Sequence, residues 1–410
     1  MPSKKNSDRH SYADMTENSG LVPLNTTDAM SLTTTKHPLC SAPDDFKLVE
    51  RFWLCVVVGV TVSTMSILFN SFIFVVFSLN RQHRKSPNLY LLLLSMFDVF
   101  IAFAYIAVLS VRVLTNFTAS VLLKSIWVKY MVPMLAVSHI GITSSTFLIC
   151  FVSIERYCIT VNNFLVPHLQ RHRPFLAFLA VMCGVVSKGT ILKEVTINTD
   201  EDCAGELNYW RVEPSQLVLR NPNFNIYWRF YFRNIFTILA PFFILLLVNC
   251  LLLYRLQEHV KKSKYIEQSD KQVVKMKKAR IRAATRSLVI IICTYLFSNV
   301  LSVIITIWEY IDSASLFAER YQSFYVLSVD VISILTIVAS CLRLPIYAIC
   351  QPLLRKEMNE CLLRFCGCGG GEMRKKKMEV VVEAKPLQSS QLINPIDSDS
   401  TSVGSRIEFV

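Results

Sequence analysis

The chain has 410 residues, of which 52% are hydrophobic, and its mean hydropathy is +0.41. Soluble domains are usually about 45–50% apolar even with glycine counted, so this composition excludes an ordinary soluble domain and favours a membrane protein. The formal net charge is +13, but the basic residues gather in membrane-flanking loops and the tail. We therefore interpret the charge as a determinant of topology and lipid attraction, with no nucleic-acid partner.

Seven apolar blocks follow one another along the chain. About 20 helical residues cross the ~30 Å hydrocarbon core of a bilayer, because a helix satisfies its own backbone polar groups. The fourth block is short and contains Lys188, so a buried or re-entrant segment is its alternative. We predict an all-α membrane protein, a seven-transmembrane helix bundle within residues 51–351. The blocks lie at about residues 52–79, 88–113, 126–158, 174–192, 228–256, 283–311 and 322–350.

Basic residues in two loops predict the orientation, because short cytoplasmic loops carry an excess of Lys and Arg. The first inter-helix loop contains Arg81, Arg84 and Lys85, and the loop between Arg255 and Arg286 is rich in Lys and Arg. Both loops should face the cytoplasm, which places the N-terminus outside in a multi-pass plasma-membrane protein. Residues 1–15 lack the apolar core of a cleaved signal peptide, so we expect the first helix to direct insertion.

The expected extracellular parts carry candidate modification sites. Residues 1–50 are polar and should be unstructured, and glycosylation sequons start at Asn25 and Asn116. Cys40 and Cys203 are the two cysteines predicted to lie outside, where an oxidising compartment favours a disulfide between them. Spacing alone does not show that these two cysteines meet.

A different pattern follows the seventh block. Residues 352–366 have apolar residues at helical spacing with charges between them, which predicts a short amphipathic eighth helix on the inner leaflet. Cys361, Cys366 and Cys368 are candidates for acylation, with a Cys-Gly-Cys metal site as the less favoured alternative. Residues 367–410 should form a disordered, phosphorylatable tail. The last residues, 408–410, could bind a PDZ domain, although such endings often arise by chance.

Polar residues inside the apolar blocks are functional candidates, because a charge within a spanning helix is costly. Asn70 lies in the first block and Asp98 in the second. Glu155, Arg156 and Tyr157 close the third, and Arg343 precedes Pro345-Ile346-Tyr347 in the seventh. Each is a weak signal alone, but their order, one per expected helix, is specific.

With these residues and Pro241, the chain resembles the rhodopsin-like G-protein-coupled receptors over about residues 50–365. In detail it is similar to invertebrate, especially nematode, FMRFamide-type neuropeptide receptors. The stretches that carry this finer resemblance are Tyr157 to Val161, Phe232 to Ile235, Ile307 to Tyr310, Phe324, and Ser328 to Val331.

The resemblance implies a two-state bundle in which an extracellular ligand favours an opening on the cytoplasmic side. Glu155 would hold Arg156 at rest and release it to a heterotrimeric G protein, with Tyr347 swinging inward beneath it. Basic residues from Lys277 to Arg286 would line the G-protein cleft. Arrestin is a further partner that the resemblance implies.

Several positions depart from the family pattern. Met131 stands where the family has a cysteine near the outer end of the third helix, and the sixth helix lacks the usual tryptophan and kinking proline. Arg343 and Leu344 replace the Asn-Pro of the NPxxY motif, and Ala339 removes a polar neighbour. Arg343 would either pair with Asp98, replacing a sodium ion, or extend to the inner interface, and the two alternatives weigh equally.

The candidate ligand residues are acidic and aromatic. Ser138 stands where amine receptors of the family have aspartate, and Ile337 where opsins have lysine, so neither ligand class is expected. A cationic peptide with an Arg-Phe-amide end would find countercharges and aromatic rings near the outer helix ends. The acids of the long loop, residues 200–202, are more simply solvated. The predicted ligand-binding residues are Glu309, Asp330, Trp308, Trp210 and Phe324.

Other functional classes fit less well. His139 in the third block is more simply a satisfied core residue than a group that contacts the ligand. We find no nucleophile triad, Gly-rich phosphate loop or metal-ligand quartet, so neither an enzyme nor a cofactor is expected. A transporter is one alternative, but the chain has no internal repeat and only 11 glycines. A receptor-like protein that no longer signals is another, suggested by the altered sixth and seventh helices.

Overall fold

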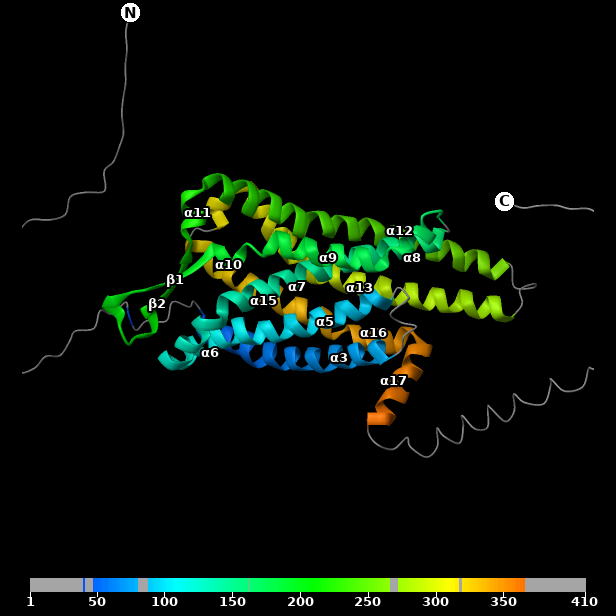
Figure 1. Ribbon diagram of the computed structural model, residues 1–410, viewed down its shortest axis with the longest axis horizontal. Helices are drawn as coiled ribbons and strands as arrows, with labels where there is room; N and C mark the ends of the chain where they lie inside the picture. The colour runs from blue at the N-terminus through cyan, green and yellow to red at the C-terminus, as the bar shows by residue number, and fades with distance from the viewer. Residues whose placement is uncertain are drawn as a thin grey trace, which may run out of the picture.

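The structure, a computed structural model, describes residue 40 and residues 47–79, 88–161, 163–265, 272–316 and 319–365. Long helices lie side by side in one bundle, with a small hairpin at one end and α17 (Pro352–Phe365) leaving the other (Figure 1). The predicted all-α bundle with seven spans is confirmed, including the doubtful fourth. The seven apolar helices run over Leu48–Leu79, Asn88–Thr118, Val121–Val161, Arg173–Glu194, Phe224–Glu258, Arg282–Ile311 and Arg320–Cys350.

The first four spans consist of helices that run on from one another. π-helical turns, which widen a helix locally and often occur at functional sites, interrupt the first and second spans near the hairpin. The first span contains α2 (Leu48–Arg51), η1 (Phe52–Val58) and α3 (Gly59–Leu79); the second contains α5 (Asn88–Tyr105), η2 (Ile106–Ser110) and α6 (Val111–Thr118). The third is α7 (Val121–Val161), and after α8 (Val166–Arg171) the fourth contains α9 (Arg173–Lys188) and α10 (Ile191–Glu194).

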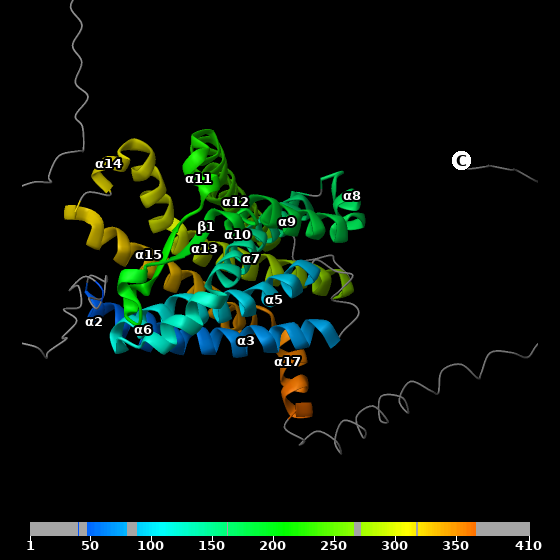
Figure 2. The ribbon, with the colours of Figure 1, turned by 60° about the vertical axis from the view of Figure 1, so that its left-hand side comes forward.

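The last three spans are built in the same way, and the fifth also starts with π-helical turns. A short helix α11 (Gln216–Arg220) precedes it, and α14 (Ser313–Leu316) joins the sixth span to the seventh (Figure 2). The fifth comprises η5 (Phe224–Phe232), η6 (Ile235–Leu239) and α12 (Ala240–Tyr265), the sixth lies in α13 (Gln272–Ile311), and the seventh in α15 (Glu319–Cys341) and α16 (Arg343–Cys350).

The hairpin joins the fourth span to the fifth. β1 (Val195–Thr199) pairs with β2 (Trp210–Pro214) in antiparallel register, with Val195 opposite Pro214. β1 is rich in β-branched residues, which favour extended backbone. Between the strands, Gly205 adopts a φ of 83°, a left-handed conformation that glycine reaches without strain. We call this end of the bundle the hairpin end, and the opposite end the α17 end.

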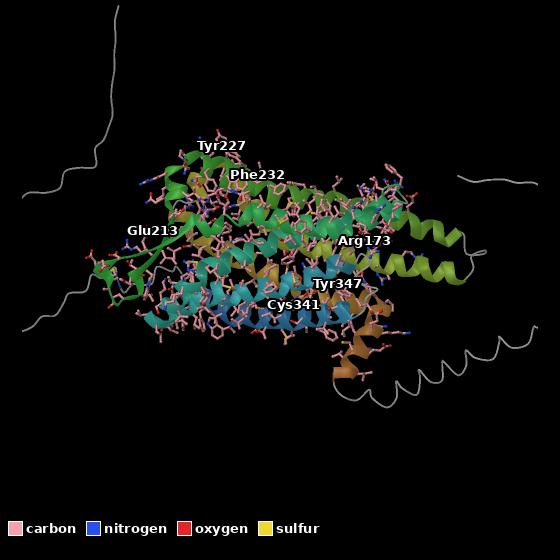
Figure 3. The ribbon with its side chains drawn as sticks, in the orientation of Figure 1. Arg173, Glu213, Tyr227, Phe232, Cys341 and Tyr347 are labelled. Atoms are coloured by element: carbon pink, nitrogen blue, oxygen red, sulfur yellow. A yellow bond between two sulfur atoms is a disulfide. The ribbon has the colours of Figure 1, made fainter. Side chains whose placement is uncertain are left out.

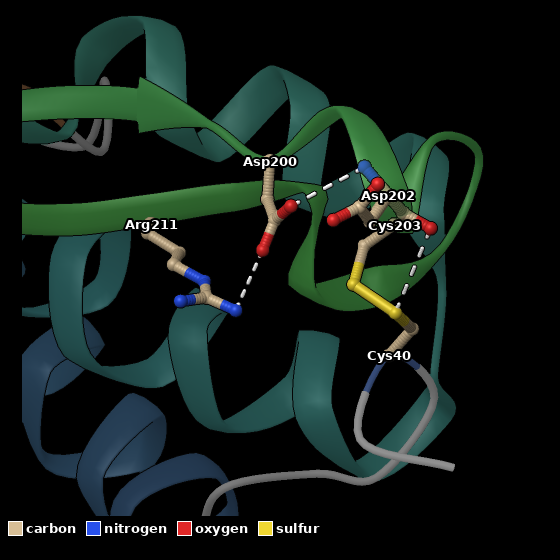
Figure 4. Close-up of a disulfide and its surroundings, with 5 residues drawn as sticks. All are labelled: Cys40, Asp200, Asp202, Cys203 and Arg211. Atoms are coloured by element: carbon tan, nitrogen blue, oxygen red, sulfur yellow. Dashed lines mark hydrogen bonds and ion pairs between the residues drawn. A yellow bond between two sulfur atoms is a disulfide. The ribbon is translucent and has the colours of Figure 1, made fainter. Parts of the chain in front are cut away.

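A disulfide joins Cys40 to Cys203, in the segment that connects the two strands (Figure 4). Arg211 of β2 pairs with Asp200 at 2.6 Å beside it. The predicted disulfide is therefore confirmed, and it fixes the chain before the first helix to the tip of the hairpin.

Helix α7 lies in the middle of the bundle and packs against α5, α9 and α12. The approach of α9 is close at Gly184, where an added Cβ would lie 2.8 Å from the carbonyl oxygen of Ile140. A larger residue would therefore push the two helices apart. The main core cluster fills the half of the bundle toward the α17 end, with Phe77, Leu148, Leu252 and Tyr347 among its buried members.

Candidate functional site

The polar centre of the bundle is an ion pair between Asp98 of α5 and Arg343 at the start of α16. Ser340 of α15 donates a hydrogen bond to Asp98 Oδ1 at 3.1 Å. Asn70 of α3 donates from Nδ2 to the Ser340 carbonyl at 3.3 Å. All four residues are buried. The pairing alternative for Arg343 is thus the one present, and the extension to the membrane interface is not.

The position of Arg343 follows from a break in the seventh span. Leu342 is a single turn residue between α15 and α16, although its backbone N–H still bonds to the Val338 carbonyl as in a helix. Arg343 becomes the first residue of α16 and points inward, with 6% of its surface exposed. A buried guanidinium requires an anion, and Asp98 on the facing helix supplies it.

At the α17 end, Glu155 pairs with Arg173 of α9 and not with Arg156. Arg173 Nη2 lies 2.5 Å and its Nε 3.0 Å from Glu155 Oε1, and the carboxylate is fully buried. The expectation of a Glu155–Arg156 pair is therefore wrong for this conformation. Adjacent residues on a helix point in different directions, so Glu155 faces α9 while Arg156 faces α13.

Arg156 and Tyr347 meet at a small cavity at the α17 end. Its volume of ≈ 10 Å³ is about that of one water position. Tyr347 is buried (Figure 3), and Tyr157, which follows Arg156, packs at the edge of the core cluster. The cavity lies between residues of the second, third, sixth and seventh spans, and it is small and not fully enclosed. Its lining residues include Leu91, Val152, Ala284, Ser287, Leu288, Ile291 and Gln351.

Two of the predicted ligand residues lie together at the hairpin end. Trp308 of α13 and Phe324 of α15 have ring centroids 6.1 Å apart, and Trp308 Nε1 donates to the Ser315 hydroxyl at 3.0 Å. Glu309 follows Trp308 and forms no hydrogen bond or ion pair with the residues described. Trp210 lies apart, against the cluster that contains Trp127 and Met131 of α7.

Asp330, the second expected countercharge, already has a partner. Arg51 Nε lies 2.6 Å and Nη2 3.3 Å from its carboxylate oxygens, and both side chains are buried. The carboxylate is therefore neutralised inside the protein and is not a free countercharge. Met131 is also buried, so apolar packing fills the position where the family has its cysteine.

Five candidate modification sites do not fit the structure or cannot be placed in it. Asn116 lies within α6 with 7% of its surface exposed, which argues against a carbohydrate attached there. Cys361 is buried with Leu354 and Met358 on the face of α17 that packs on the core, which argues against its acylation. Asn25, Cys366 and Cys368 lie outside the described residues.

The sequence analysis missed several buried charges that the structure brings together. Arg51 and Arg173 stood at the edges of apolar blocks, where a basic residue is ordinary, so neither was singled out. Glu194, Arg229 and Arg233 form a cluster at the hairpin end beside Lys188. The four-residue spacing of Arg229 and Arg233, which places them on one helix face, was the signal that could have found the cluster.

These features define a protein with seven apolar spans, a paired polar centre, a small cavity toward the α17 end and a disulfide-anchored hairpin at the other end. The sequence profile of the 7 transmembrane receptor (rhodopsin family) matches residues 69–346. The chain therefore belongs to the rhodopsin family of G-protein-coupled receptors, which are multi-pass plasma-membrane signalling proteins that couple an extracellular ligand to a G protein. Among curated proteins, none matches the chain.

Proposed function

We propose that this receptor recognises an extracellular neuropeptide, FMRFamide-like in chemistry, at the hairpin end and activates a heterotrimeric G protein at the α17 end. The orientation is supported by the Cys40–Cys203 disulfide, since disulfides persist in oxidising compartments. It is also supported by the basic residues in the last turns of α12 and the first turns of α13, since these two helices extend at the opposite end of the bundle (Figure 1).

The small size of the cavity lined by Arg156 and Tyr347 is the observation that carries the proposal. A G protein needs room between the third, sixth and seventh spans, and ≈ 10 Å³ does not provide it. Activation must therefore move α13 away from α7. Two contacts of α13 would break or slide: the 3.0 Å hydrogen bond between Tyr295 and Thr146, and the 2.6 Å bond from Gln351 to Ser287.

No proline kinks α13, whose whole length from Gln272 to Ile311 is proline-free. The usual hinge of the sixth helix is thus replaced here. The Tyr295 hydroxyl ties the middle of α13 to α7, and Cys293, two residues before it, accepts from Asn249 Nδ2 of α12 at 3.1 Å. We propose that α13 moves as one rigid helix once the Tyr295–Thr146 and Asn249–Cys293 hydrogen bonds break.

On the ligand side, Trp308, Phe324 and Glu309 form the candidate subsite for an Arg-Phe-amide end. The two rings offer aromatic contact, and the free Glu309 carboxylate offers a countercharge for arginine. Because Arg51 neutralises Asp330, Glu309 is the acid we expect to contact the ligand.

The test is a screen in cells that express the receptor and report calcium and cAMP. Peptides ending in Arg-Phe-amide should activate it, the same peptides with a free C-terminal acid should be much weaker, and Arg156→Gln should abolish signalling without changing surface expression. Glu309→Gln should lower potency toward arginine-containing peptides only. Activation by unrelated peptides, with no response to any amidated peptide, would refute the ligand class.

A further inference from the structure

A cluster of charges lies at the hairpin end, where the fourth and fifth spans meet. Glu194 ends α10, and its carboxylate receives Arg229 Nε at 2.9 Å and Arg233 Nη1 at 2.9 Å on both oxygens. The Thr190 hydroxyl donates to Glu194 Oε1 at 2.6 Å. Both carboxylate oxygens thus already accept two hydrogen bonds, and Glu194 is saturated.

Lys188 is the unmatched member of this cluster. It ends α9, is 9% exposed, and forms no hydrogen bond or ion pair with any described residue. Lys188 lies within electrostatic range of Arg233 and Glu194, and His139 of α7 lies within electrostatic range of all three groups. Lys188, Arg229 and Arg233 are therefore three cationic side chains around the single carboxylate of Glu194.

Arg233 adds a second unmatched donor. Its Nη1 is engaged by Glu194, but its Nε is buried without a hydrogen-bond partner among the described residues. An ammonium and a guanidinium N–H left unpaired in the membrane are both costly. A bound anion would offset this cost.

The remaining acids near the hairpin end are engaged or lie elsewhere. Asp200 pairs with Arg211, and Glu213 accepts from Asn198 Nδ2 at 2.6 Å. Glu309 lies on α13, where its charged or polar neighbours are Tyr310 and Tyr325. No described acid other than Glu194 is thus placed to neutralise Lys188.

We infer that Lys188 and Arg233 bind an anionic group of the receptor's ligand, in the first instance a carboxylate. This inference rests on the proposed function and extends it: the peptide carries an acidic group as well as its arginine. The acid lies against the fourth and fifth spans, while the arginine reaches Glu309 at the end of the sixth. Charges at two separated points fix the direction in which the peptide lies in the bundle.

The test compares two synthetic peptides, Asp-Phe-Met-Arg-Phe-amide and Asn-Phe-Met-Arg-Phe-amide, each acetylated at its N-terminus. On the unmodified receptor the Asp peptide should be about 10- to 100-fold more potent, because hydrogen bonds to charged groups are the stronger ones. Lys188→Gln should remove this difference, and Lys188→Arg should retain most of it. The matched control is Lys193→Gln, which changes an exposed lysine of α10. Equal potencies of the two peptides on the unmodified receptor overturn the inference while the proposed function stands.

A second measurement needs no activating peptide. Millimolar phenylacetate should raise the thermal unfolding temperature of the purified receptor more than the neutral phenylacetamide does, and Lys188→Gln should abolish the difference. If neither peptide activates the receptor but phenylacetate stabilises it through Lys188, the anion site stands and the peptide class fails. Equal stabilisation by the acid and the amide, or an effect unchanged in Lys188→Gln, overturns the site.

Discussion

Removing the charge of Asp98 is the sharpest test of the polar centre. Asp98→Asn keeps the size of the side chain and an oxygen that can still accept from the Ser340 hydroxyl. What it removes is the anion opposite Arg343. An arginine side chain keeps its charge under ordinary conditions, so Arg343 would remain as a buried ion without a partner. The substitution therefore isolates the contribution of the negative charge to the free energy of unfolding.

The magnitude follows from burial. Asp98 and Arg343 expose 1% and 6% of their surfaces, so water cannot replace the lost partner. Leaving one member of a buried pair uncompensated costs about 3–5 kcal/mol. That corresponds to roughly two to three and a half orders of magnitude in the ratio of folded to unfolded protein. Removing both charges, in Asp98→Asn with Arg343→Gln, should recover most of the loss, because two neutral groups tolerate burial better than one ion.

Thermal unfolding of the detergent-solubilised receptor measures this without a ligand. A thiol-reactive dye reports unfolding, because free cysteines such as Cys55 and Cys150 are buried in the native state. The single variant should unfold at a clearly lower temperature than the double variant. If the double variant is no more stable than the single one, the two charges do not form a pair.

The same assay tests whether arginine replaces a cation. Exchanging choline chloride for sodium chloride at constant ionic strength should leave the unfolding temperature of the unmodified receptor unchanged, since Arg343 occupies the carboxylate. A sodium effect on stability or agonist affinity that Asp98→Asn abolishes would falsify this account.

Three further outcomes are expected. Loss of the disulfide in Cys40→Ser, in Cys203→Ser or in the double variant should lower the free energy of unfolding by about 2–4 kcal/mol. The same dye assay measures this after accessible thiols of the native protein have been blocked. A double variant destabilised by the sum of the two single effects would contradict a bond between the two cysteines. Arg173→Met removes the buried partner of the α7 glutamate and should raise ligand-independent G-protein activation, whereas Arg171→Met at an exposed site should not; equal activity of both variants would contradict a restraining role. Tyr295→Phe deletes one hydrogen bond between α13 and α7, worth about 0.5–1.5 kcal/mol, and should raise basal signalling about 2- to 10-fold; unchanged basal signalling would exclude this bond as a restraint.

The spans were predictable because a bilayer leaves the backbone few solutions. The ends of the spans were harder to predict. The predicted third block covered residues 126–158, whereas the helix runs over Val121–Val161. The polar residues Lys124, Ser125 and Lys129 near its start lower the hydropathy without breaking the helix. The π-helical turns of η1, η2, η5 and η6 had no signal in composition, because they depend on packing between helices.

Of the candidate site, the Asp98–Arg343 pair was within reach of sequence reasoning, since a charge inside the membrane must find its opposite. The pairs of Arg51 with Asp330 and of Arg173 with Glu155 were not. Each joins a residue at the edge of one span to an acid in another, and sequence order does not give the facing of two helices. The polar residues within a single helix could therefore be recognised from the sequence, whereas most ion pairs between helices could be identified only from the structure.

The Cys40–Cys203 bond closes a covalent ring around the first four spans and leaves the last three outside it. A single protease cut in any loop within that ring cannot release a fragment, because the two pieces stay joined through sulfur. A cut between the fifth and sixth spans separates the chain into pieces held only by packing. Cleaved receptor should thus run as one band on a non-reducing gel when the cut falls between Cys40 and Cys203, and as two bands when it falls outside that ring.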